Sequence, residues 1–191
     1  MRKSIVRGGM SEFYYRSLAV KLRQGAIISY PCEGLYGVGC DPFNLSAVSK
    51  ILDIKQRSMD KGLIVVAANT DQLRVFVEDC WLEKKALQQT WAGAVTWLCP
   101  AKDTVPYWLT GNHVTLAVRV SAHPVIQRIC SAFDAAIVST SMNLASHTPL
   151  RSKLLVRSLF GRQLDVICKG SLGGLGQETR IFDAQTGQQI R

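Results

Sequence analysis

Residues 27–41 read IISYPCEGLYGVGCD, residues 55–62 read KQRSMDKG, and residues 63–69 read LIVVAAN. Two apolar runs therefore flank a glycine-rich segment, a short amphipathic helix and a basic loop. Lys55, Arg57 and Lys61 lie within seven residues of one another, and Asp60 is the only acid among them. A basic cluster between two buried strands favours a polyanion ligand, with a nucleoside triphosphate as the first candidate. A solvated basic loop is the plainer alternative.

Composition sets the broad class of the protein. A chain of 191 residues with 47% apolar and 19% charged residues is long enough for one domain with a substantial core. Its formal charge of +9 favours anionic partners, and nucleotides, RNA and acidic membranes all qualify. The longest aliphatic run, Leu63–Ala68, is too short to cross a membrane, and the basic N-terminus is not followed by the apolar run of a secretory signal. We therefore expect a soluble cytoplasmic protein without membrane association.

The cysteines point to a reducing compartment. There are six, and none forms a C-x-x-C pair, which argues against a zinc site and against a disulfide framework. Cys32 is followed by Glu33 and has no neighbouring cation to lower its pKa, so packing is favoured over a role as a nucleophile. The sequence also lacks a third dinucleotide-binding glycine, a P-loop and an H-E-x-x-H motif. A nucleotide would have to bind by a less common route.

Alternating apolar strands and amphipathic helices predict a single α/β domain spanning residues 11–191, preceded by a flexible N-terminus at residues 1–10. The glycine-rich segment after residue 31 is expected to be a tight turn, and Ser46 is expected to cap the helix that ends near residue 54. The expected strands are 26–30, 63–68, 94–99, 115–120, 136–140 and 164–169, with a hairpin over 179–191. The expected helices are 11–24, 46–54, a helix starting at 70, 82–90, 123–132 and 152–160.

Five segments together resemble one known family. They are YPCEGLYGVGCD at 30–41, the K-x-R pair at 55–57, KGLI at 61–64, LAVRV at 116–120 and STSMN at 139–143. The chain resembles the short bacterial form of the YrdC/TsaC family. The resemblance implies a twisted, mostly parallel mixed sheet, flanked by helices, around a positively charged cavity. It also implies a nucleotidyltransferase that converts L-threonine, bicarbonate and ATP into threonylcarbamoyl-adenylate and pyrophosphate. A partner complex would then transfer the threonylcarbamoyl group to the adenosine next to the tRNA anticodon.

The resemblance carries roles over to individual positions. The implied catalytic residues are Lys55, Arg57, Ser141 and Asn143. The implied ATP-binding residues are Arg57, Lys61, Thr115, Ser141 and Arg191. The implied threonine-binding residues are Cys32, Gly34, Arg119, Ser139 and Thr179. No side chain is expected to ligate a metal directly, and Mg²⁺ would arrive with ATP. The family usually has threonine where this chain has Cys32. The family's polar contact from this position to the substrate threonine would therefore be weaker or absent here.

Other functions remain open at this point. The basic segments 1–24 and 151–163 also suit a non-enzymatic module that binds double-stranded RNA or tRNA. A ribosome-maturation paralogue of the same fold is a third alternative. Direct tRNA contact would be compatible with the synthase as well. Arg119 lies on an apolar strand, and a half-buried arginine needs a partner that the sequence nearby does not supply.

Overall fold

The computed structural model describes residues 12–144 and 147–191. The expected flexible N-terminus and any cap at Ser11 lie outside these residues. The helices are α1 (Glu12–Arg23), α2 (Leu45–Lys55), α3 (Asp79–Leu82), α4 (Lys85–Thr90), α5 (Tyr107–Thr110), α6 (Pro124–Phe133) and α7 (Lys153–Phe160), with 3-10 turns η1 (Met59–Lys61) and η2 (Asp71–Leu73). The strands are β1 (Ile28–Pro31), β2 (Tyr36–Gly39), β3 (Ile64–Ala67), β4 (Val95–Pro100), β5 (Thr115–Val120), β6 (Ile137–Ser141), β7 (Val166–Ile167) and β8 (Arg180–Asp183).

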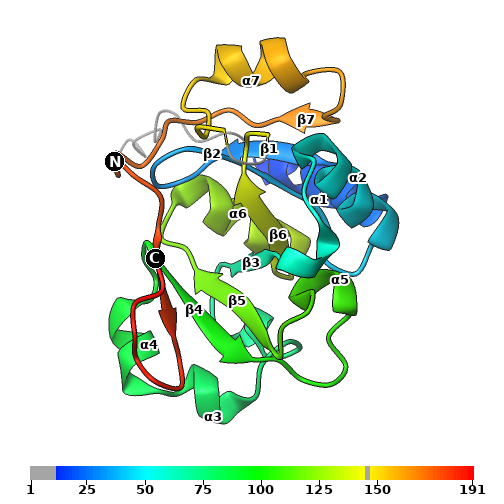
Figure 1. Ribbon diagram of the computed structural model, residues 1–191. Helices are drawn as coiled ribbons and strands as arrows, with labels where there is room; N and C mark the ends of the chain where they lie inside the picture. Colours follow the sequence, from blue (N-terminus) through cyan, green and yellow to red (C-terminus); the bar gives the residue numbers. More distant parts are fainter. Residues whose placement is uncertain (1–11, 145–146) are drawn as a thin grey trace, which may run out of the picture.

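Within the described residues the strands form one eight-stranded mixed sheet in the order β7-β1-β2-β6-β3-β5-β4-β8. The expected α/β fold with a mixed sheet and flanking helices is confirmed. The sheet has two halves, β7-β1-β2 and β3-β5-β4-β8, and Figure 1 shows the first above the second. Three of its seven pairings are parallel and four are antiparallel, so the sheet is mixed, as expected, but not mostly parallel. Strand β6 joins the halves, because its first residues pair with β3 and its last two pair with β2.

Both faces of the sheet are covered by apolar side chains. Along β3, Val65 and Ala67 point into one buried cluster with α2, whereas Val66 points into a second cluster with α1 and α6. This follows from the period of two in a strand, which sends successive side chains to opposite faces. A continuous apolar run is therefore what a strand covered on both sides requires, and the predicted interior position of this segment is confirmed.

The glycine-rich segment folds differently from the prediction. Instead of one turn, residues 36–39 form strand β2, and only residues 32–35 turn, closed by a 2.9 Å hydrogen bond from Cys32 N to Leu35 O. Gly39 lies so close to β6 that an added Cβ would fall 1.9 Å from the carbonyl oxygen of Val138. The glycine thus serves a close approach of two strands rather than a bend.

Two other expectations also needed correction. The stretch 101–113, in which neither a helix nor a strand is expected, contains α5, and the helix predicted from residue 70 is only the short turn η2. These segments have few residues and no sustained periodicity, so tertiary packing decides their conformation. Among the described residues, none of the helices combines the length and apolar character needed to cross a membrane.

The N-cap of α2 supports a first prediction. Asn44, rather than the expected Ser46, caps the helix, and its Oδ1 accepts a 3.0 Å hydrogen bond from Ala47 N. Asn44→Ala is expected to lower the free energy of unfolding by about 1 kcal/mol. Chemical denaturation would measure the change in the free energy of unfolding. Ser46→Ala is the matched control, because Ser46 is exposed and its side chain is not the one that caps α2. Equal destabilisation by both variants would contradict the assignment of the cap.

Candidate active site

A cavity of about 270 Å³ lies where the two halves of the sheet meet. Alternation along β5 creates one wall, because Thr115, Ala117 and Arg119 line the cavity while the residues between them enter the core. Ten of the twelve residues predicted from the sequence line this cavity. They are Cys32, Gly34, Arg57, Lys61, Thr115, Arg119, Ser139, Ser141, Thr179 and Arg191. The two that do not line it are Lys55 and Asn143.

The charged side chains in the described part of the wall are four cations and two carboxylates. They are Arg57, Lys61, Arg119, Arg191, Glu33 and Glu178. The excess of cations suits an anionic ligand. The sign of the electrostatic potential inside the cavity stays a prediction.

The basic loop presents Arg57 to the cavity from a fixed backbone. Its Nη2 donates to Gly62 O at 3.0 Å and to Lys61 O at 3.2 Å, so the guanidinium closes the loop on itself. Gly62 has a φ of +60°, and an added Cβ would lie 2.7 Å from Thr110 O, so this position demands glycine. Burial, followed by the nearby charge of Arg191, lowers the pKa of Arg57. These two arginines therefore flank one region of the cavity.

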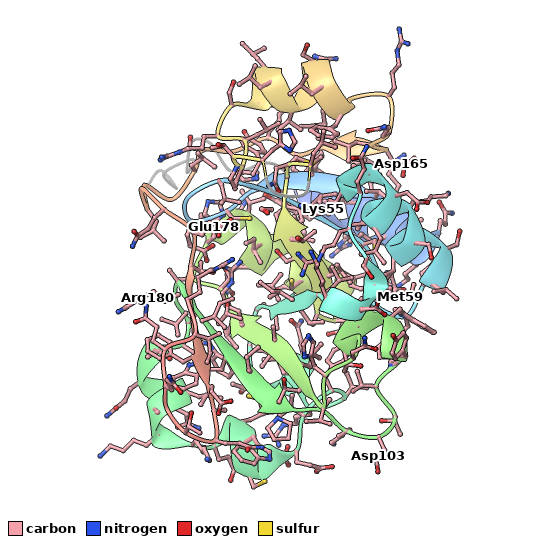
Figure 2. All side chains as sticks on the ribbon, viewed as in Figure 1. Lys55, Met59, Asp103, Asp165, Glu178 and Arg180 are labelled. Atoms are coloured by element: carbon pink, nitrogen blue, oxygen red, sulfur yellow. The ribbon has the colours of Figure 1, made fainter. Side chains whose placement is uncertain are left out.

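Lys55 has a position that the sequence did not indicate. Its side chain is buried, and Nζ donates to Asn143 Oδ1 at 2.8 Å, to Asn143 O at 3.1 Å and to Ser141 O. Ser141 Oγ in turn donates to Asn143 Oδ1 at 2.7 Å. Figure 2 shows Lys55 in the interior of the fold rather than at its rim. Lys55 thus ties the end of α2 to the S-x-N segment and does not line the cavity with Arg57, and its catalytic role stays a prediction.

The ammonium of Lys55 is held in a poorly solvated place. Burial, reinforced by the positive charge of Arg57, lowers its pKa from 10.5 to about 8. The group therefore titrates close to physiological pH, unlike an exposed lysine.

Arg119 has the acidic partner that the neighbouring sequence did not supply. Its Nη1 lies 3.4 Å from Glu33 Oε2, and the side chains are only 6% and 11% exposed. Glu33 comes from the turn after β1 and also accepts a hydrogen bond from Ser121 Oγ. In the sequence, Glu33 stands out only as a neighbour of Cys32. A buried arginine that needs a counter-ion was the one signal that could have drawn attention to it.

The segment 171–179, called the strap here, lies between β7 and β8 in the chain (Figure 1), and its last three residues, 177–179, line the cavity. Its backbone donates to Cys32 O from Gly173 and to Glu33 O from Leu175, at 3.0 and 2.8 Å. An added Cβ at Gly34 would lie 2.2 Å from the Gln177 carbonyl oxygen, so this glycine lets the strap approach. The tight approach explains why a glycine lines the cavity at this point.

The strap ends beside the C-terminal residue. Glu178 forms a 2.8 Å ion pair with Arg191, and the Arg191 Nη2 donates to Thr179 O at 3.2 Å. Figure 2 labels Glu178 on this segment. The predicted hairpin therefore brings Arg191 to the cavity, whereas the sequence did not indicate Glu178 as a lining residue.

Cys32 contributes a thiol, not a thiolate. Burial raises its pKa to about 12, although Arg119 opposes the shift, and the expectation of a packing role over a nucleophile fits this. Within residues 12–144 and 147–191, no three His, Cys, Asp or Glu side chains are grouped so as to hold a metal ion.

Comparison with known sequences identifies the family. The family Sua5/YciO/YrdC, described as "Telomere recombination", matches residues 20–191. The chain belongs to this family. A threonylcarbamoyl-AMP synthase of Halorhodospira halophila is 42% identical over 96% of this chain and 96% of its own length. One of Methylococcus capsulatus is 44% identical over 96% of this chain and its entire length.

Solved structures agree with the family assignment. Sua5 of P. abyssi in complex with L-threonine is 28% identical, with a TM-score of 0.84, and the match covers 93% of this chain. The match covers only 53% of the Sua5 chain, so this family member spans about half the length of that relative. E. coli YciO, at 20% identity and a TM-score of 0.79, shares the fold.

Proposed function

We propose that this family member is a threonylcarbamoyl-AMP synthase, which forms threonylcarbamoyl-adenylate and pyrophosphate from L-threonine, bicarbonate and ATP. The observation that carries the proposal is one cavity in which the cations Arg57, Lys61 and Arg191 lie together with Arg119. Full-length relatives at 42–44% identity that bear this name support it. The product would supply the threonylcarbamoyl group for the adenosine next to the tRNA anticodon.

At the nucleotide end, the residues stabilise charge. The amine of threonine adds to bicarbonate with loss of water, and an oxygen of the resulting carbamate attacks the α-phosphorus as pyrophosphate leaves. Negative charge then grows on the phosphate oxygens, and Arg57, Lys61 and Arg191 are placed to offset it. Thr115 and Ser141 add hydroxyl groups to the same wall. Lys55 and Asn143 hold Ser141 in place from outside the cavity.

At the amino-acid end, Arg119 can bind a carboxylate through two parallel hydrogen bonds. Ser139 and Thr179 line the same cavity and can serve the threonine hydroxyl. Cys32 replaces the family's usual threonine and offers only a weak donor. The end of the strap lines this region, and a cavity that limits the access of water would protect the short-lived carbamate.

Magnesium fits this site only as part of the nucleotide complex. The described cavity wall has two separated carboxylates, Glu33 and Glu178, and both are within 4 Å of an arginine nitrogen. We therefore propose that ATP carries Mg²⁺, which would supply charge neutralisation at the phosphates. Arg57 and Arg191 orient the phosphates from the protein side.

The pathway implies further partners, which we also propose. The adenylate would pass to a threonylcarbamoyl-transfer complex in the cytoplasm. Direct tRNA contact would use the arginines in and beside α7, where Arg157 is exposed and Arg151 and Arg162 lie just outside the helix.

Pyrophosphate release tests the proposed function. The purified chain is expected to release pyrophosphate from ATP only when threonine and bicarbonate are both present, because the carbamate is the nucleophile. Omission of each substrate in turn provides the controls. Pyrophosphate release that does not depend on threonine would reject the proposed synthase function. In that case the alternatives are a ribosome-maturation paralogue or an RNA-binding module, and the latter would show RNA affinity that falls steeply with salt.

A further inference from the structure

Three buried polar atoms of the cavity wall lack a hydrogen-bond partner among the described residues, and they are Glu33 Oε2, Arg57 Nε and Arg119 Nε. Two of them, Glu33 Oε2 and Arg119 Nε, belong to one ion pair. The side chains face each other with Arg119 Nη1 at 3.4 Å from Glu33 Oε2, which is longer than the usual 2.7–3.2 Å of a good N–H···O bond. Opposite charges are therefore adjacent without satisfying one another. Unpaired buried groups are rare and costly, and a ligand is one way in which they become paired.

Glu33 is held from several sides. Its Oε1 accepts from Ser121 Oγ, and Ser121 Oγ accepts a 3.0 Å hydrogen bond from His123 N. Its carbonyl oxygen accepts from Leu175 N of the strap at 2.8 Å. The carboxylate is thus anchored through one oxygen, which leaves the other beside Arg119.

The pair is matched to one class of ligand. A ligand with only a carboxylate would gain from Arg119 but would be repelled by Glu33. A ligand with only a cationic group would be attracted by Glu33 but repelled by Arg119. An α-amino acid carries its N–H donors and its carboxylate on the same carbon, so it can pair with both groups together.

We propose that Glu33 is a specificity-determining residue that holds the amino nitrogen of the amino-acid substrate while Arg119 holds its carboxylate. This inference deepens the proposed function and rests on it. A carboxylate can accept a hydrogen bond from the ammonium form and from the neutral amine, so the contact persists when the nitrogen becomes a nucleophile. Glu33 thereby selects α-amino acids over acids that lack the amino group.

Calorimetric titration of two ligands tests the proposal. L-threonine and 3-hydroxybutanoate differ only in the amino group and would be titrated into the wild-type chain and Glu33→Gln. Threonine is expected to bind the variant about 10- to 100-fold more weakly, the range for a hydrogen bond to a charged group. 3-Hydroxybutanoate is expected to bind the variant more tightly, because the repulsive carboxylate is gone.

Two further variants separate this role from a structural one. Glu178→Gln makes the same charge change at the other carboxylate of the cavity, and is expected to leave the ratio of the two affinities unchanged. Ser121→Ala removes the anchor of Oε1 and the acceptor of His123 N but leaves the Glu33 carboxylate in place, and is expected to shift that ratio less than Glu33→Gln. Equal weakening of both ligands by Glu33→Gln, or no change in either, would overturn the proposal.

The same titration distinguishes the two levels of inference. The wild-type chain could fail to bind threonine but bind another α-amino acid in a Glu33-dependent manner. That result would reject the proposed synthase function and support the proposed role of Glu33. If threonine binds and supports pyrophosphate release equally well in Glu33→Gln, the synthase stands and the role of Glu33 fails. If the wild-type chain binds no α-amino acid, both the synthase function and the role of Glu33 are rejected.

Discussion

Arg57→Ala is expected to lower kcat/KM for ATP in pyrophosphate release about 10²–10³-fold, the typical effect of removing one preorganised donor at developing charge. The side chain lines the cavity, and its position is set by bonds to the backbone of residues 61 and 62. Because it is only half-buried and forms no ion pair in the described chain, the melting temperature should change little. Steady-state kinetics and thermal denaturation would measure the two effects.

Two variants serve as controls for Arg57. Arg57→Lys keeps the charge but loses the planar fork, so it should recover only part of the activity. Arg16→Ala removes an exposed arginine of α1 that pairs with Glu12 alone in the described structure, and should leave kcat/KM unchanged. Wild-type activity in Arg57→Ala would show that the loop is merely solvated.

Lys55→Met is expected to reduce kcat/KM about 10²-fold, although Lys55 does not line the cavity. Its ammonium donates to three oxygens of the Ser141–Asn143 segment, and a small displacement of a positioning group can cost that much. Stability should also fall, by about 1–3 kcal/mol, because buried acceptors lose their donor. Denaturation and kinetics of the same preparation would separate the two effects.

The pH profile provides a sharper test of Lys55. Its pKa of about 8 means that a rise in pH through 8 removes the charge, and a neutral amine has two N–H donors for three acceptors. The activity ratio of wild type to Lys55→Arg should therefore fall around pH 8, since the guanidinium stays charged. Use of the ratio cancels the titration of substrates. A ratio that is constant from pH 7 to 10 would contradict a positioning role for the charge.

Stability should respond to pH in the opposite direction. The pKa of Lys55 is lowered from 10.5 on folding, so between pH 8 and 10.5 the unfolded chain binds more protons than the folded chain. Burial of the charged Lys55 ammonium lowers the free energy of unfolding. This destabilisation is complete below pH 8 and disappears above pH 10.5. The contribution of Lys55 to the free energy of unfolding therefore rises with pH while its contribution to activity falls.

Much of the site could be predicted because its residues lie in short motifs on elements with clear patterns. Alternation on β5 makes Arg119 point away from the core formed by Val118 and Val120, and the K-x-R pair follows a helix with a clear apolar stripe. Lys55 could not be placed, because a lysine at a helix end looks solvated until the partner segment is known. Glu178 was missed because only the closing hairpin brings it beside Arg191.

The pattern of apolar residues along the chain predicts which faces of the strands and helices are buried, and therefore the class of the fold and the strand that presents Arg119. Hydrophobic periodicity is local, and it is readable in a single chain. Which charged side chains come into contact depends on how distant segments pack in three dimensions. Glu33 with Arg119, and Lys55 with Asn143, are each separated by more than 80 residues, and they meet only because β6 joins the two halves of the sheet.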